Sequence, residues 1–286
     1  MKFFLDFKAD NDSIYKCKDI TGLDIAESID DAEVVLIKGS LNHGKNTRII
    51  QCLFAGTDFL DLSKVPPGIT VLNNAGGYNE PVAETVFALI LSHLKNICSH
   101  NADMHNAVFK KRKVDILYRK KIGIIGFGGI GKQVSKIALA FGMDVFAFTR
   151  RRTIEPGITT IPNLMDLAMN VDIAVICVPL TGETRGMINE AFLSKFGGNI
   201  IVNIARADIV DQDSMLRFLS ENPSKFYLSD VWWNEPEIKV KPPANCMVTP
   251  HIGGMGDAFR NESFERACYS IRKYLDGSKS NVVVQG

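Results

Sequence analysis

Four glycines within six residues, Gly126 to Gly131, constrain the fold of this 286-residue chain more than any other feature. The run Gly-Phe-Gly-Gly-Ile-Gly follows an apolar segment at 122–125 and precedes a helical pattern at 133–141 and a second apolar segment at 144–148. These segments predict a strand–helix–strand unit. In that context the first glycine permits a tight turn, the third residue lets a pyrophosphate approach the backbone, and the last glycine lets helix and strand pack closely. This segment, called the glycine loop below, therefore predicts a dinucleotide bound at a helix N-terminus.

The residues after the second strand of this unit indicate which dinucleotide binds. A site for NAD carries an acidic residue there, which holds the ribose 2′-hydroxyl. This strand ends instead in Thr149-Arg150-Arg151-Arg152. Because arginine pairs with a phosphate through its planar fork, Thr149, Arg150 and Arg151 predict a site for NADP(H) in preference to NAD(H). The alternative is that the arginines only face solvent.

Apolar runs alternate with helical and turn segments along the whole chain, and this pattern predicts an α/β fold. The predicted strands lie at 3–7, 33–38, 49–54, 69–73, 122–125, 144–148, 173–178, 199–203, 226–230 and 247–249. We expect two flavodoxin-like or Rossmann-like domains with parallel sheets. The cofactor domain, 93–256, is inserted in a discontinuous substrate domain made of 1–92 and 257–286, to which the helical C-terminal segment returns.

Composition excludes several classes of partner. The formal net charge of +1 argues against nucleic acid and against an acidic membrane surface. No run of about 18 apolar residues predicts a transmembrane helix, and Asp6 interrupts the apolar N-terminus too early for a signal peptide. The six cysteines form no C-x-x-C pair and no zinc-binding spacing, so we expect no metal and a cytoplasmic location.

Three polar residues follow predicted strands of the second domain: Arg206, Glu235 and His251. Each has a simple alternative explanation, as a loop charge or a solvated turn residue. Together they suit hydride transfer to a ketone, in which a histidine supplies a proton to the oxygen. A neighbouring carboxylate favours the protonated imidazole, and an arginine binds the carboxylate of a 2-oxo acid. We therefore expect all three at the carboxyl edge of a parallel sheet, where ligands bind.

At this point the chain resembles the D-isomer-specific 2-hydroxyacid dehydrogenases. The resemblance is high over about 121–256 and looser in the first domain. The matching segments, in the order of the family, are 122–131, 179–181, 203–206, 230–236 and 250–253. The resemblance implies that His251 is the proton donor and acceptor, that Glu235 raises its pKa, and that Arg206 binds the carboxylate and carbonyl of the substrate.

The resemblance also implies binding residues. Asp230 contacts the nicotinamide carboxamide, and the loop 54–58 binds substrate through Ala55 and Gly56, together with Arg206 and His251. The predicted cofactor-binding residues are Gly126, Phe127, Gly128, Gly129, Ile130, Gly131, Thr149, Arg150, Arg151, Val178, Pro179, Thr184, Ile204, Ala205, Asp230, His251 and Gly253.

The chain departs from the pattern of the family in three places. Ala207 replaces the usual glycine after the arginine, the pair Trp232-Trp233 replaces a less bulky pair, and the first domain is short. Trp233 either belongs to the core or narrows the active site. These departures affect the identity of the substrate more than the type of reaction. Glyoxylate and hydroxypyruvate, whose reduced form is D-glycerate, are the first candidates.

Two other functions compete with a 2-oxo acid reductase. Some similar proteins are corepressors that sense a dinucleotide and bind protein motifs without physiological turnover. Family members that oxidise formate carry glutamine at the position of Glu235, which argues against that activity here. The resemblance also implies a homodimer built on the cofactor domain.

Overall fold

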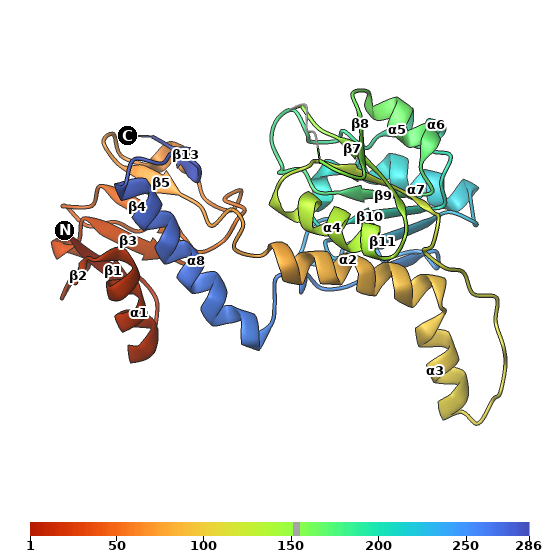
Figure 1. Ribbon diagram of the computed structural model, residues 1–286, viewed down its shortest axis with the longest axis horizontal. Helices are drawn as coiled ribbons and strands as arrows, with labels where there is room; N and C mark the ends of the chain where they lie inside the picture. Colours follow the sequence, from red (N-terminus) through yellow and green to blue (C-terminus); the bar gives the residue numbers. More distant parts are fainter. Residues whose placement is uncertain (151–154, 286) are drawn as a thin grey trace. The chain divides into compact units, whose positions relative to one another are not determined.

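The chain has an α/β fold of two compact units, as predicted (Figure 1). The computed structural model describes residues 1–150 and 155–285. One unit consists of 1–78 with 255–286, and the other of 79–254. Each unit contains its own sheet with helices on it, and each is described separately below.

The first unit has a six-stranded sheet in the order β13-β5-β4-β3-β1-β2. Its strands are β1 (Lys2–Leu5), β2 (Asp24–Ile25), β3 (Val34–Ile37), β4 (Ile49–Cys52), β5 (Thr70–Leu72) and β13 (Val282–Val284). All neighbours are parallel except β13, which pairs antiparallel with β5. The five parallel strands have the flavodoxin-like order 2-1-3-4-5. Helices α1 (Asn11–Thr21) and α8 (Asp257–Leu275) lie side by side in this unit, with the short helices η1 (Ile29–Asp31) and η2 (Leu62–Lys64).

The second unit has a fully parallel, seven-stranded sheet in the order β12-β11-β10-β9-β6-β7-β8. The strands are β6 (Lys121–Ile125), β7 (Asp144–Phe148), β8 (Ile158–Ile161), β9 (Ile173–Ile176), β10 (Ile200–Asn203), β11 (Phe226–Ser229) and β12 (Cys246–Val248). Successive strands are added on one side of β6 up to β8, and then on the other side of β6 from β9 to β12. Such a reversal opens a crevice at the carboxyl ends of the strands, between β6 and β9.

Helices cover both faces of this sheet, which explains why every residue of β9 and β10 is buried. The helices of this unit are α2 (Asn79–Leu94), α3 (Ile97–His105), α4 (Gly129–Ala140), α5 (Leu164–Asn170), α6 (Glu190–Lys195), η3 (Ala207–Ile209) and α7 (Gln212–Glu221), of which all but α3 lie near the sheet (Figure 1). Short polar side chains begin several of them. Asn163, Asn189 and Asp211 accept hydrogen bonds from backbone N–H groups in the first turns of α5, α6 and α7.

Helix α2 packs on α4 and belongs to the second unit. The sequence predicted a substrate domain of 1–92 with 257–286 and a cofactor domain of 93–256. These functional bounds stay a prediction. Helix α3 and the segment after it extend away from the sheet of the second unit (Figure 1). Within the described residues, no helix combines the length and the apolar character needed to cross a membrane.

Candidate active site

The glycine loop follows β6 directly and contains the start of α4, as its sequence predicts. Gly126 has a φ of +100°, and a Cβ atom there would lie 2.7 Å from a methyl carbon of Val178. A Cβ atom on Gly131 would lie 2.3 Å from the carbonyl oxygen of Gly126. Gly126 therefore excludes a side chain because of its positive φ and because Val178 lies beside it. Gly131 excludes one because the helix and the strand approach each other closely there.

The N-terminus of α4 fits the phosphates of a dinucleotide. Gly128 is its N-cap, and within the described part of the chain no side chain accepts a hydrogen bond from the first turn. Apart from Gly128 and its two neighbours in the chain, no described residue has an atom within 4 Å of a Cβ atom placed on Gly128, so there is open space in front of the loop. Free N–H groups and the positive end of the helix dipole both favour an anion in this space.

The residues expected to select the dinucleotide follow β7. Thr149 is half-buried, and the exposed guanidinium of Arg150 is 2.6 Å from a carboxylate oxygen of Glu183. Arg151 and Arg152 lie outside the described residues. Since an exposed ion pair contributes little free energy, Arg150 can exchange Glu183 for another anion at small cost.

The loop after β9 borders the glycine loop, through the contact of Val178 with Gly126 noted above. Thr184, which is buried, donates a hydrogen bond of 2.6 Å to the carbonyl oxygen of Pro179 and accepts one of 2.8 Å from the backbone N–H of Thr181. Thr184 thus holds the shape of this loop. The predicted cofactor contacts of Val178, Pro179 and Thr184 stay predictions.

His251 and Glu235 are brought together, although 16 residues separate them in the chain. Nδ1 of His251 lies 2.7 Å from Oε1 of Glu235, and the second carboxylate oxygen accepts a longer bond of 3.4 Å from the backbone N–H of Trp232. His251 has a φ of +53°, a left-handed conformation that is uncommon for residues other than glycine. Since Nδ1 is engaged with the carboxylate, Nε2 is the ring nitrogen left to face a substrate.

The pair shifts both pKa values towards the charged forms. The hydrogen bond to Glu235 is the main cause that raises the pKa of His251, against the effects of burial and of the nearby Arg206 charge. Burial raises the pKa of Glu235, but the hydrogen bond and charge of His251, together with the Trp232 N–H and the charge of Arg206, leave that pKa below its ordinary value. His251 therefore remains an imidazolium to higher pH than a free histidine.

Arg206 follows β10 and lies close enough for its charge to act on both partners of this pair. Its side chain is half-buried and donates a 2.8 Å hydrogen bond to the carbonyl oxygen of Ala205. Asn203, fully buried at the end of β10, donates a 2.9 Å bond to the carbonyl oxygen of Arg206 and accepts one of 3.0 Å from the N–H of Ala205. Buried hydrogen bonds thus hold the backbone that carries the guanidinium.

Asp230 organises the loop that carries His251. Its Oδ1 accepts hydrogen bonds from Oγ1 of Thr249 at 2.6 Å and from the N–H of Ile252 at 2.9 Å, and its Oδ2 accepts from the N–H of Gly253 at 2.6 Å. A Cβ atom on Gly253 would lie 2.6 Å from Oδ2, so this contact requires glycine. The contact of Asp230 with a nicotinamide stays a prediction, but its role in shaping this loop is visible in these bonds.

A buried polar network joins the ends of β10 and β11, and the sequence did not predict it. The hydroxyl of Tyr227 accepts a 3.0 Å bond from Nδ2 of Asn203 and lies 3.4 Å from Oγ of Ser229, which donates to the carbonyl of Val231 at 2.6 Å. Burial raises the pKa of Tyr227 to about 12, so the hydroxyl stays protonated. The only signal in the sequence was an asparagine at the end of an apolar strand.

Trp232 and Trp233 belong to the core of the second unit. Their side chains are buried, and the indole N–H groups donate to the carbonyl oxygens of Val240 at 2.7 Å and Val210 at 3.0 Å. Both rings pack on Tyr227. This burial favours the core role of Trp233 over the alternative that it narrows the active site.

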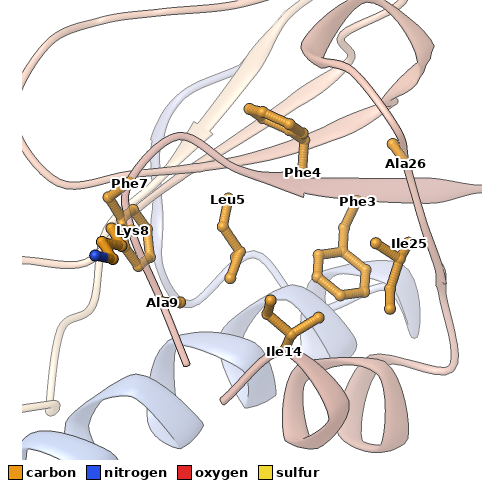
Figure 2. A pocket seen from close by; sticks show the side chains of 9 residues that line it. All are labelled: Phe3, Phe4, Leu5, Phe7, Lys8, Ala9, Ile14, Ile25 and Ala26. Carbon is orange, nitrogen blue, oxygen red and sulfur yellow. The ribbon is translucent and has the colours of Figure 1, made fainter. Parts of the chain in front are cut away.

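Ala55 and Gly56 lie in the first unit, after β4, where Nδ2 of Asn73 donates a 2.8 Å bond to the carbonyl oxygen of Ala55. Their binding of substrate stays a prediction. Figure 2 shows a different feature of this unit, a cavity of about 260 Å³ between β1, α1 and β2. Its lining is almost entirely apolar, with Lys8 as the one charged residue among the nine, and it contains no predicted site residue.

Known proteins match the chain over most of its length. A family model described as the NAD binding domain of the D-isomer specific 2-hydroxyacid dehydrogenases matches residues 87–253. Hydroxypyruvate reductase from Thermotoga maritima is 34% identical over 73% of this chain and 72% of that protein. Glyoxylate/hydroxypyruvate reductase A from Arabidopsis thaliana is 28% identical over 81% of this chain and 76% of that protein. The structure of a glycerate dehydrogenase related protein from Thermoplasma acidophilum has a TM-score of 0.75 at 37% identity, and covers 96% of this chain and 100% of that one.

Proposed function

Because the chain belongs to the D-isomer specific 2-hydroxyacid dehydrogenase family, we propose that it is an NADP(H)-dependent reductase of a small 2-oxo acid. The family makes it an NAD(P)-dependent oxidoreductase that acts on the CH–OH group of 2-hydroxy acids. Glyoxylate and hydroxypyruvate are the first substrates to test, since reductases of these acids are among its relatives.

The observation that carries this proposal is the hydrogen-bonded pair of His251 and Glu235 with the charge of Arg206 beside it. Reduction of a carbonyl creates negative charge on its oxygen and requires an acid at neutral pH. A bound nicotinamide supplies or accepts the hydride. The imidazolium of His251 donates a proton from Nε2 to the carbonyl oxygen, while Glu235 orients the ring through Nδ1 and stabilises its charge.

Arg206 binds the other end of the substrate. Its guanidinium pairs with the carboxylate of the 2-oxo acid, and a planar two-point contact fixes the direction of the adjacent carbonyl. In the opposite direction neutral His251 accepts the proton of the hydroxyl group. The same three residues therefore serve reduction and oxidation, and pH decides which protonation state of His251 is available.

Arg150 supports the preference for NADP(H), since it is exposed at the end of β7 and paired only with the exposed Glu183 among the described residues. In this proposal the 2′-phosphate replaces Glu183 as the partner of Arg150. Six free cysteines fit the reducing, cytoplasmic location proposed with it.

A panel of 2-oxo acids assayed with NADPH and with NADH tests the proposal. We expect the highest kcat/KM with glyoxylate or hydroxypyruvate and NADPH. A higher kcat/KM with NADH would reject the cofactor preference. Binding of a dinucleotide with no turnover of any 2-oxo acid would favour the alternative of a corepressor-like binding protein.

We also propose that the chain forms a homodimer through α3 and the segment that follows it. This part of the second unit extends away from the sheet (Figure 1) and exposes a large set of apolar side chains. They are Ile97, Met104, Val108, Phe109, Val114, Ile116 and Tyr118. Phe109 is 80% exposed, and an apolar surface of this extent is typical of a contact with another chain. Light scattering should give twice the mass of the chain, and a monomer at micromolar concentration would contradict the proposal.

A further inference from the structure

Asn79, the first residue of α2, lies against the glycine loop. A Cβ atom on Gly129 would lie 2.5 Å from Oδ1 and 2.6 Å from Nδ2 of Asn79, closer than carbon atoms of side chains approach such groups. The dinucleotide motif leaves the position of Gly129 open to any residue. The side-chain amide of Asn79 therefore explains why this position carries no side chain.

This contact brings the N-termini of two helices together. Asn79 begins the 16-residue helix α2, and Gly129 begins the 12-residue helix α4. The N-terminus of each helix carries a partial positive charge of about half a unit. The pyrophosphate of a dinucleotide is a double anion, so two helix N-termini at one place suit it better than one.

The amide of Asn79 has no hydrogen-bond partner among the described residues, although its side chain is half-buried. The amide is not sealed from solvent, so a ligand can reach it. Next to it, the space in front of Gly128 is open. An amide N–H at this point can donate to an oxygen of a phosphate in that space.

Helix α2 continues from the glycine loop to the catalytic loop. Six residues after Asn79, the Cβ atom of Thr85 is 3.7 Å from the position of a Cβ atom on Gly253, two residues after His251. Six residues of helix span about 9 Å. The start of α2 therefore lies along the path from the phosphate end of the cofactor site to the nicotinamide end.

We propose that Nδ2 of Asn79 donates a hydrogen bond to the pyrophosphate of the bound dinucleotide, in addition to the backbone N–H groups of the glycine loop. The proposal rests on a nicotinamide dinucleotide as cofactor, which the family implies, but not on which 2-oxo acid is reduced or on the preference for NADP(H).

The test measures binding of ADP-ribose, which carries the pyrophosphate without the nicotinamide, by isothermal titration calorimetry. Asn79→Ala should weaken binding about tenfold, the effect of a hydrogen bond to a charged group. Asn79→Asp has the same size but places a carboxylate beside the phosphates, so it should weaken binding further, by about 100-fold. If Asn79→Asp binds ADP-ribose within about twofold of the unmodified protein, the proposal is wrong.

Three controls separate this role from a packing role. Asn11→Asp makes the same charge change at the exposed first residue of α1 and should leave binding unchanged. Adenosine 2′-monophosphate lacks the pyrophosphate, so its affinity should be the same for Asn79→Asp as for the unmodified protein. The Tm of each variant without ligand should change little, whereas a loss of Tm together with equal losses for both ligands would show that Asn79 only packs against α4.

A double substitution tests the geometry without any ligand. Gly129→Ala should lower Tm, because the new methyl group collides with the amide of Asn79. In the background of Asn79→Ala the same substitution should cost much less, since the three nearest atoms all belong to Asn79. Equal losses in both backgrounds would show that the amide does not lie over Gly129. Failure of the unmodified protein to bind ADP-ribose would instead reject the dinucleotide as cofactor, and with it both proposals.

Discussion

Two regions of the second unit hold their polar side chains in different ways: the proposed catalytic edge, and the proposed site of the ribose phosphate, called the ribose corner below. At the proposed catalytic edge, formed by the ends of β10, β11 and β12, buried groups hold the segments that carry Arg206 and His251. Asn203 and Tyr227 support the backbone of Arg206, and Asp230 binds the loop of His251 at three points. At the ribose corner, the end of β7, Arg150 is 77% exposed and its described ion pair is with the equally exposed Glu183.

The difference follows from the chemistry assigned to each region. Proton and hydride transfer require a fixed geometry, because small displacements of reacting groups cost large factors in rate. Attraction between an arginine and a phosphate falls slowly with distance and tolerates several side-chain conformations. We therefore expect substitutions at the catalytic edge to have large effects on rate or stability, and those at the ribose corner to change only the choice of dinucleotide.

The largest effect is expected for His251→Ala at the catalytic edge. Loss of the general acid should lower kcat for 2-oxo acid reduction by about 10²–10⁴-fold. Steady-state kinetics with saturating NADPH measure this. His43→Ala, at an exposed position of the first unit, should keep normal kcat. A kcat within tenfold of normal for His251→Ala would break the comparison, since the catalytic edge would then have no essential acid.

Glu235→Gln should have the next largest effect, and it should depend on pH. Reduction needs the imidazolium, so its rate falls as pH rises through the raised pKa of His251. Without the carboxylate that pKa falls, so the decline of reduction should move to lower pH. At pH values above the decline the rate should drop by about 10–100-fold, as expected for the loss of a charge-assisted hydrogen bond.

The pH profile of kcat/KM in both directions checks this prediction. Oxidation of the hydroxy acid needs neutral His251, so in Glu235→Gln it should extend to lower pH than in the unmodified protein. An unchanged pH midpoint in both directions would show that Glu235 does not control the protonation of His251.

Arg150→Gln sharpens the comparison at the ribose corner. It should raise the Kd for NADPH by about tenfold and leave the Kd for NADH unchanged. Tenfold is the lower end of the effect of losing a hydrogen bond to a charged group, and we expect that end because the site is exposed. Arg185→Gln is a matched control, because Arg185 is also exposed and paired with a carboxylate, Asp208. Equal losses for both dinucleotides would mean that Arg150 does not contact the 2′-phosphate.

The smallest effect is expected for Tyr227→Phe, which removes one hydroxyl from the buried network. The free energy of unfolding should fall by about 1 kcal/mol, and KM for the 2-oxo acid should rise a few-fold as the backbone of Arg206 loosens. Urea denaturation and steady-state kinetics measure both. Tyr15→Phe, on the exposed face of α1, should change neither. If Tyr227→Phe is equally silent, the network does not position Arg206, and the contrast between the two regions is weaker than proposed.

The strands were the most predictable part of the fold. Ten were expected, and all ten occur within two residues of their expected ends, because buried parallel strands are short and continuously apolar. The strands that were not expected are at sheet edges: β2, β8 and β13. Their residues are mostly half-buried or exposed, so their sequences carry a weaker apolar signal.

By itself the sequence determined which residue types stand at the carboxyl ends of the strands. Glycines between a strand and a helix, and Arg206, Glu235 and His251 after later strands, already indicated a dinucleotide and hydride transfer, because a parallel sheet brings such positions to one edge. Only the tertiary structure decided the contacts among them. It paired Nδ1 of His251 with Glu235, made Asp230 the anchor of the loop that carries His251, and placed Asn79 over Gly129. These contacts join segments from 16 to 50 residues apart, and their distances depend on packing between elements, which the local pattern of residues does not specify.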